Sequence, residues 1–168
     1  VNDSPVLTSI GDQTTAEDSP LTITLTGSDV DEDALTYSAV SDNEDVSVSV
    51  VDAELTFTSS EDYNGTASVT VTVSDGFLTD SETFTLTITP VNDAPIAEDV
   101  SVSPSVPLGT DDLVLTYEYS DVDGDVEGGT VINWYKNAEV QVEYDNLLTV
   151  PSAATVCDEV WYAEVTPS

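Results

Sequence analysis

Apolar and hydroxyl residues alternate along several short stretches of this chain. The alternation is strict in residues 21–26, 46–50, 69–73 and 84–88, where Val, Leu, Ile or Phe stands at every second position. A period of two with one apolar face predicts β-strands that bury one side. Turn-forming pairs such as Asn64-Gly65 and Asp75-Gly76 separate these stretches. The first half therefore predicts a two-sheet β-sandwich of about seven strands.

Strand-like stretches continue in the second half, at residues 100–103, 113–119, 131–136 and 159–166. Trp134-Tyr135 and Trp161-Tyr162 lie where an immunoglobulin-like core needs large side chains, and we expect them to fill the core or the space between sheets. No segment has helical spacing over three turns. We therefore predict an all-β chain of tandem Greek-key β-sandwiches with almost no helix.

Two phrases occur twice and define modules. Val1-Asn2-Asp3-Ser4-Pro5 returns as Val91-Asn92-Asp93-Ala94-Pro95, an offset of 90 residues (91 minus 1). Residues 28–33, Ser-Asp-Val-Asp-Glu-Asp, return at 120–125 as Ser-Asp-Val-Asp-Gly-Asp, an offset of 92 (120 minus 28). Nearly equal offsets indicate successive modules of about ninety residues. We predict one β-sandwich at 1–93 and a second at 94–168.

The second module is expected to be incomplete. Residues 94–168 number only 75 (168 minus 94, plus 1), which is short for a full sandwich. Its final strand should be missing. Two explanations stay open: the sequence is a segment cut from a longer polypeptide, or a strand from another molecule completes the sandwich.

Charge excludes several classes of function. The chain has 34 acidic residues, one base (Lys136) and no His or Arg, for a formal charge of −33. A field of this sign repels nucleic acid and anionic membranes, and no run of about 18 apolar residues predicts membrane insertion. The commonest general base is absent, so we expect no enzyme.

Cys157 is the single cysteine of the chain. We expect a buried thiol, with a partner elsewhere as the alternative.

The two repeated phrases, at 1–5 with 91–95 and at 28–33 with 120–125, are rich in the oxygen atoms that hard metal ions bind. Calcium takes six to eight oxygens from carboxylates, amides and carbonyls in flexible geometry. Alternate residues of an extended Asp-x-Asp-x-Asp point the same way, so Asp29, Asp31 and Asp33 could converge on one ion. Asp121, Asp123 and Asp125 could do the same. Because Asp and Asn are also common turn residues, a single copy would mean little, but two copies in register favour Ca²⁺ binding.

Four phrases in residues 1–95 resemble bacterial cadherin-like repeats, the calcium-binding extender domains of large surface adhesins. They are the Val-Asn-Asp-Ala-Pro linker, the Asp-x-Asp-x-Asp before Leu-Thr-Tyr-Ser, Glu61-Asp62-Tyr63-Asn64-Gly65, and Val73-Ser74-Asp75-Gly76. Residues 96–168 resemble the immunoglobulin-like or PKD-like repeats found beside such modules.

The resemblance implies which further residues bind calcium at module junctions. One set comprises Glu17, Asp62 or Asp75, Asn92 and Asp93, together with Asp121 and Asp123. A second set comprises Asn2 and Asp3 with Asp29 and Asp31. Asp62 and Asp75 could instead be ordinary hairpin residues, because Asp-Gly and Asn-Gly form turns without any metal.

These observations predict an extracellular or cell-surface protein with a structural role. The leading hypothesis is a calcium-stabilised extender segment of a large secreted or surface-anchored adhesin, whose partners are neighbouring repeats of the same polypeptide. The alternative is a subunit of an extracellular filament assembled by β-strand donation from neighbouring subunits. A third hypothesis is carbohydrate binding through Trp134, Tyr135, Trp161 or Tyr162.

Overall fold

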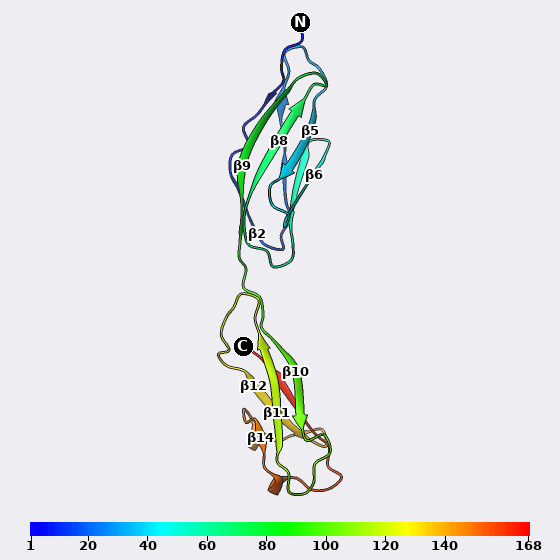
Figure 1. The fold of residues 1–168 in the computed structure, drawn as a ribbon, viewed down its shortest axis with the longest axis vertical. Helices are drawn as coiled ribbons and strands as arrows, with labels where there is room; N and C mark the ends of the chain where they lie inside the picture. Colours follow the sequence, from blue (N-terminus) through cyan, green and yellow to red (C-terminus); the bar gives the residue numbers. More distant parts are fainter. The chain divides into compact units, whose positions relative to one another are not determined.

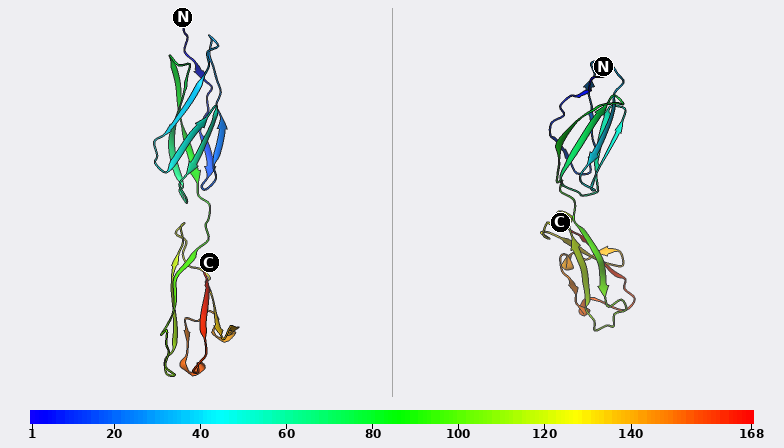
Figure 2. Two further views of the ribbon diagram at one scale, coloured as in Figure 1. Left: turned by 90° about the vertical axis from the view of Figure 1, so that its right-hand side faces the viewer. Right: turned by 45° about the horizontal axis from the view of Figure 1, so that its top comes forward.

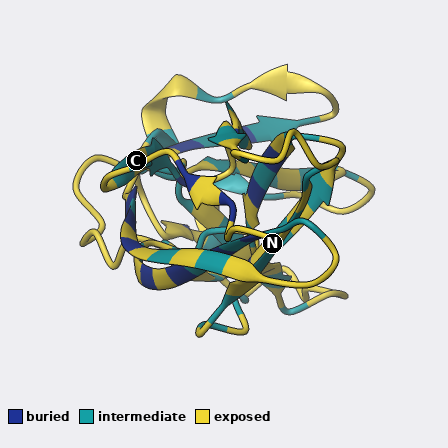
Figure 3. Ribbon diagram, turned by 90° about the horizontal axis from the view of Figure 1, so that it is seen from above, coloured by how far each residue is buried: buried dark blue, intermediate teal, exposed yellow.

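Strict alternation of apolar positions produces strands with one buried face. In β8 (Gly65–Ser74), Val69, Val71 and Val73 are completely buried, whereas Thr70 and Thr72 between them are partly exposed. The stripes of buried and exposed residues along the strands are visible in Figure 3. The computed structural model describes all residues, 1–168, and divides them into two units, Val1–Val91 and Asn92–Ser168 (Figure 1).

The first unit is a sandwich of two main sheets. One sheet has four strands in the order β2 (Gln13–Ala16), β9 (Thr79–Thr89), β8 and β5 (Thr36–Ser41). The other has three in the order β3 (Leu21–Thr24), β7 (Glu54–Ser59) and β6 (Val46–Val51). A short pair, β1 (Val6–Leu7) with β4 (Gly27–Ser28), completes the unit. All neighbours are antiparallel except β2 and β9, which are parallel.

Side chains from both sheets meet in one core. Leu55 and Phe57 of β7 are buried against Val69, Val71 and Leu86 from β8 and β9. Phe57 meets Phe84 edge to face, with ring centroids 6.1 Å apart at 83°. This arrangement joins the two sheets by the geometry that aromatic quadrupoles favour.

Strand β9 is longer than the sequence pattern predicted. The predicted strand began at residue 84, but the structure begins it at Thr79. The positions that alternate with Phe84 toward the N-terminus are Asp80 and Glu82, so the apolar face stops there although the strand continues. Strands β2, β5 and β7 were also not predicted individually.

The second unit has two three-stranded sheets. One contains β10 (Ile96–Ser103), β11 (Leu113–Ser120) and β14 (Thr149–Val150) in that order. The other contains β13 (Glu139–Val140), β12 (Val131–Lys136) and β15 (Trp161–Thr166), which leaves β15 at the edge of its sheet. Figure 2 shows these strands from two further directions.

Trp134 is the centre of the second core. It is completely buried among Leu113, Leu115, Ile132 and Val150, and its Nε1–H donates to the carbonyl of Leu147 at 2.8 Å. A buried indole N–H needs such an acceptor. The prediction that Trp134 is a core residue is confirmed.

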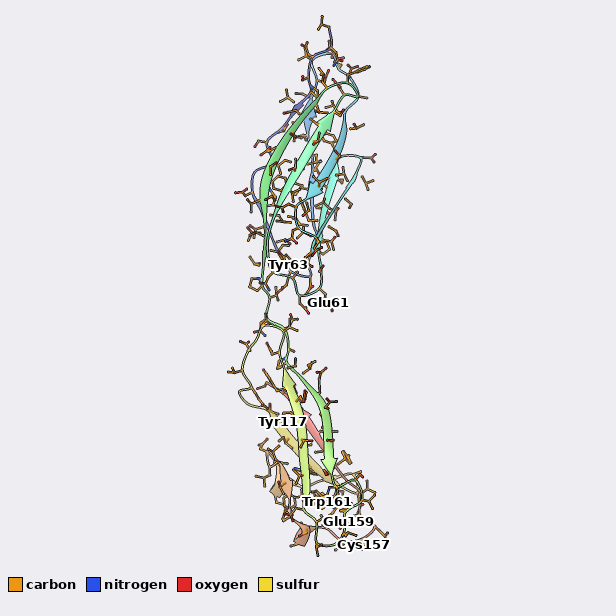
Figure 4. All side chains as sticks on the ribbon, in the orientation of Figure 1. Glu61, Tyr63, Tyr117, Cys157, Glu159 and Trp161 are labelled. Carbon is orange, nitrogen blue, oxygen red and sulfur yellow. The ribbon has the colours of Figure 1, made fainter.

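Cys157 does not lie in this core. Its side chain is exposed, in the loop before β15, close to Glu159 and Trp161 (Figure 4). The expectation of a buried thiol was wrong, because Trp161 and not Cys157 is the residue of this region that packs against Trp134 and its neighbours.

Helical structure is confined to two 3₁₀ turns, Val142–Tyr144 and Ser152–Ala154. The predicted all-β class with tandem β-sandwiches is confirmed. None of the helical turns has the length and apolar character that crossing a membrane requires.

Val71→Ala is expected to destabilise the first unit much more than Val40→Ala does. Both residues lie in the same sheet, but Val71 is completely buried and Val40 is 64% exposed. Losing two buried methyl groups costs about 1.6 kcal/mol of transfer free energy, and the remaining cavity adds to this loss. Urea unfolding measures both free energies. Equal losses in the two variants would contradict the packing described here.

Candidate metal centre

The first Asp-rich phrase forms a turn and not the extended strand that the sequence suggested. Asp29 Oδ1 accepts the backbone N–H groups of Asp31 (2.8 Å) and Asp33 (3.4 Å). Glu32 has a left-handed backbone with φ of 59°. The chain therefore winds around the Asp29 carboxylate, as Asx turns do.

Winding the turn brings three carboxylates together. One oxygen from each of Asp29, Asp31 and Asp33 lies within 4.8 Å of the other two. The second oxygen of Asp29, Oδ2, is buried and has no hydrogen-bond partner. A buried acceptor without a donor is costly, and a cation would satisfy it. No Lys, Arg or His is available in Val1–Val91, so the donor set fits a hard metal ion.

The first linker phrase is bonded to this turn. The backbone N–H of Asp3 donates to Asp31 Oδ2 at 2.8 Å, and the Asn2 amide donates to Asp75 Oδ2 at 2.8 Å and to the Asp3 carbonyl at 3.1 Å. Residues from three separate parts of the chain, including Asp75 after β8, therefore meet at one end of the first unit.

Asp75 also closes the hairpin between β8 and β9. Its Oδ1 accepts the N–H groups of Leu78 at 2.6 Å and Phe77 at 2.7 Å. The Leu78 N–H has the largest effect in lowering the pKa of Asp75, followed by the Asn2 amide and the Phe77 N–H. Asp75 is thus a hairpin residue that is bonded to the first linker phrase through Asn2. The resemblance to cadherin-like repeats had grouped it instead with Glu17, Asn92 and Asp93, with an ordinary hairpin residue as the alternative.

The second unit repeats the same bonds at the equivalent positions. The N–H of Asp93 donates to Asp123 Oδ2 at 2.7 Å, as Asp3 does to Asp31, and the N–H of Asp125 donates to Asp121 Oδ1 at 3.0 Å, as Asp33 does to Asp29. The amide of Asn92 donates to the Asp93 carbonyl at 2.7 Å.

Backbone conformation is repeated too. Gly124, with φ of 79°, takes the place of Glu32 in the turn. The two turns differ in one respect, because the carboxylates of Asp121, Asp123 and Asp125 do not form a trio like that of the first turn.

Glu17 lies in another part of the first unit, close to other side chains that carry oxygen atoms. It is 2% exposed, and its carboxylate accepts the N–H of Val91 at 2.5 Å and the amide of Asn64 at 3.3 Å. Close by, Asp18 Oδ1 accepts the N–H of Asp62 at 3.3 Å. Glu61 and Tyr63, which flank Asp62, are marked in Figure 4.

Asp18 and Asn64 were not among the predicted site residues. Asn64 is part of the Glu61–Gly65 phrase, and Asp18 adjoins Glu17, so their positions in the sequence were the available signal. Asp18 and Asp62 both have φ of 56°, a left-handed conformation that Asp tolerates better than most residues.

Aromatic side chains of the second unit do not form an open binding platform. Trp134 is completely buried. Tyr135 and Tyr162 stack on each other across β12 and β15, with centroids 4.7 Å apart and rings 5° from parallel. Trp161 packs against the core, and the Lys136 ammonium group lies over its ring, 5.5 Å from the ring centroid. These contacts match the predicted structural role and do not favour carbohydrate binding.

Sheet order and core packing in the first unit define an immunoglobulin-like β-sandwich. The family model of the bacterial Ig domain matches residues 2–89, which is more than half of the chain, and the chain belongs to this family. Such domains are usually extracellular or surface-located. The family is a coarser assignment than the cadherin-like adhesin repeat expected from the linker phrases.

Three solved structures are similar to this chain. Human protocadherin-24 EC1-2 is 23% identical, with 75% of this chain and 68% of that chain covered and a TM-score of 0.48. An endo-fucoidan hydrolase from glycoside hydrolase family 107 is 16% identical (70% and 27% covered, TM-score 0.46). Drosophila N-cadherin EC1-4 is 14% identical (99% and 48% covered, TM-score 0.45). This chain spans less than half of the latter two. The comparison with curated proteins found no match.

Asn2→Ala is expected to raise the pKa of Asp75 toward its ordinary value of 3.8, because one of the donors that stabilise the carboxylate is removed. The stabilisation from Asp75 is present above its unfolded pKa and is lost as pH falls through the lower folded value. An NMR titration of the carboxyl carbons measures the shift. Glu82, whose pKa is lowered by other donors, serves as the internal control; an unchanged Asp75 would contradict the Asn2 contact.

Proposed function

We propose that this chain is a calcium-stabilised extender segment of a large secreted or surface-anchored adhesin. The observation that carries the proposal is the Asp29 turn, where three carboxylates gather around a buried oxygen that has no hydrogen-bond donor. Like charges at this spacing repel one another, and Ca²⁺ would turn the repulsion into attraction.

Further oxygens are available to complete a coordination shell. Asn2, Asp3 and Asp75 are bonded to one another or to the turn and would supply side-chain and backbone oxygens beside Asp29, Asp31 and Asp33. In the second unit, Asn92 is bonded to Asp93, Asp93 to Asp123, and Asp125 to Asp121. These residues would supply oxygens in the same way. Glu17 and Asp62, with Asp18 and Asn64, would provide another group of oxygens in the first unit.

A structural role, not catalysis, suits the rest of the chain. There is no His or Arg to activate a nucleophile or bind an anion, and the exposed surface is acidic. Extracellular modules bind calcium at dissociation constants of about 10⁻⁴ to 10⁻³ M. Sites of this strength would fill outside the cell and stay empty in a cytosol. The partners of such a segment would be neighbouring repeats of the same polypeptide.

Calcium is expected to raise the melting temperature of the first unit, and Asp31→Asn is expected to remove most of the increase. At ten times its dissociation constant, one bound ion adds about 1.4 kcal/mol, which corresponds to about 6–11 °C for a unit of this size. Differential scanning calorimetry in 10 mM CaCl₂ and in chelator measures the shift.

Asp52→Asn is the matched control. Asp52 lies in the turn between β6 and β7, has φ of 56°, and is exposed. The substitution removes the same charge while Asn tolerates the same backbone, so the calcium shift should persist. Identical melting in calcium and chelator would refute the proposal. An equal shift in 10 mM MgCl₂ would contradict a site that is selective for calcium.

A filament subunit is the second candidate, because β15 is an edge strand. Its inward side chains, Trp161, Ala163 and Val165, are only partly buried although they pack toward the core. An added strand could pair with this edge and cover them. The donor would be the N-terminal segment of a neighbouring copy, near residues 1–10.

Light scattering in calcium separates the two candidates. An extender segment should have the mass of the monomer, 17.8 kDa. A filament subunit should form polymers that disappear when residues 1–10 are deleted. Concentration-dependent polymers of the full chain would overturn our preference for the extender.

A further inference from the structure

The segment 6–12 is attached to β9 through carboxylates and not through a backbone ladder. On one side it pairs with β4, where Val6 faces Ser28 and Leu7 faces Gly27 and the Thr8 N–H donates to the Thr26 carbonyl. On the other side, Asp80 Oδ2 accepts the Leu7 N–H at 2.9 Å.

Glu82 makes most of the remaining contacts with this segment. Its Oε2 accepts the Ile10 N–H at 3.0 Å, and its Oε1 accepts the Ser9 hydroxyl at 3.0 Å and the Gly11 N–H at 3.4 Å. A single ionised carboxylate therefore satisfies three donors. A protonated carboxyl group has less acceptor capacity and must place a proton of its own.

Both carboxylates occupy positions on the core-facing side of β9. They alternate with Phe84, Leu86 and Ile88, which are buried. Opposite Asp80 and Glu82 on β8 lie Val73 and Val71, both completely buried. Asp80 and Glu82 thus lie where the apolar face of β9 would otherwise continue. Hydrogen bonds from the N–H groups of segment 6–12 offset the cost of placing two charged groups there.

Protonation would act directly on this attachment. The first unit contains no basic side chain. The Ile10 N–H has the largest effect on the pKa of Glu82 and lowers it; burial raises it, the Ser9 hydroxyl and the Gly11 N–H lower it, and repulsion from Asp80 on the same strand raises it. Because the folded pKa lies below the ordinary 4.5, the contribution of Glu82 is complete above the unfolded pKa and is lost as pH falls through the folded value.

We propose that acid releases segment 6–12 from β9. Protonation of Glu82 detaches residues 9–11 from β9 while the two sheets of the first unit remain folded. On the C-terminal side of these residues, Asp12 Oδ1 still accepts the Thr85 N–H at 2.9 Å. The device is independent of calcium, since neither Glu82 nor Asp80 bonds to a residue of the Asp29 turn or its linker.

Hydrogen exchange in Glu82→Gln tests the proposal at pH 7. Gln has the shape of the protonated acid, so it reproduces the released state without a pH change. Protection of the Ile10 and Gly11 amides should fall at least tenfold, while the amides of Val71 and Leu86 keep their protection. Glu44→Gln, at an exposed position outside this contact, should leave every amide unchanged.

As the pH of wild-type protein is lowered from 7 through the folded pKa of Glu82, the same local loss should appear, after correction for intrinsic exchange, both in calcium and in calcium-free buffer. Agreement in calcium-free buffer separates this result from the calcium proposal. Unchanged protection at Ile10 in Glu82→Gln would overturn the inference. Equal loss at Ile10 and at Val71 would also overturn it, because the whole unit would then be opening.

Discussion

Carboxylates in this chain are stabilised by backbone N–H groups because basic side chains are almost absent. One ion pair is present, between Lys136 and Glu159 at 3.4 Å, against 34 acidic residues. Hydrogen bonds to an ionised acceptor are stronger than neutral ones. Turns, the attachment of the N-terminal segment and the start of the linker all depend on this kind of bond.

The same constraint explains why the two Asp-rich phrases adopt the same turn in units whose strands differ. In each turn, the first Asp accepts the N–H four residues later, and the second Asp accepts an N–H from the linker phrase. The linker and the turn are about thirty residues apart in sequence, so each unit uses one bond to fix its own N-terminal end against a later loop.

A carboxylate whose oxygens accept hydrogen bonds stabilises the fold but has less capacity left to bind a metal ion. A carboxylate that is satisfied by N–H and O–H donors of the chain, as at Glu82, needs no metal. A carboxylate with a buried oxygen that lacks a donor, as at Asp29, retains capacity for one. This difference, and not the density of negative charge, is what separates a structural acid from a candidate ligand.

The sequence by itself determined the class of fold, the strands with strict alternation and the residues of the repeated phrases. Period-two alternation is a local property, so β8, β11 and β12 follow from it directly. The resemblance to cadherin-like repeats likewise grouped Asp3 with Asp31, and Asp93 with Asp123, before any contact was known.

Only the tertiary structure decided how those residues meet. An extended Asp-x-Asp-x-Asp and a turn around Asp29 have the same sequence, and the choice depends on bonds to residues far along the chain, such as Asp3. The start of β9 at Thr79 also depends on such bonds, because the acids at 80 and 82 interrupt the apolar pattern and are satisfied by a segment about seventy residues earlier. Long-range hydrogen bonds leave no periodic signal in the sequence, and for that reason Asp18, Asn64 and the role of Glu82 were found only in the fold.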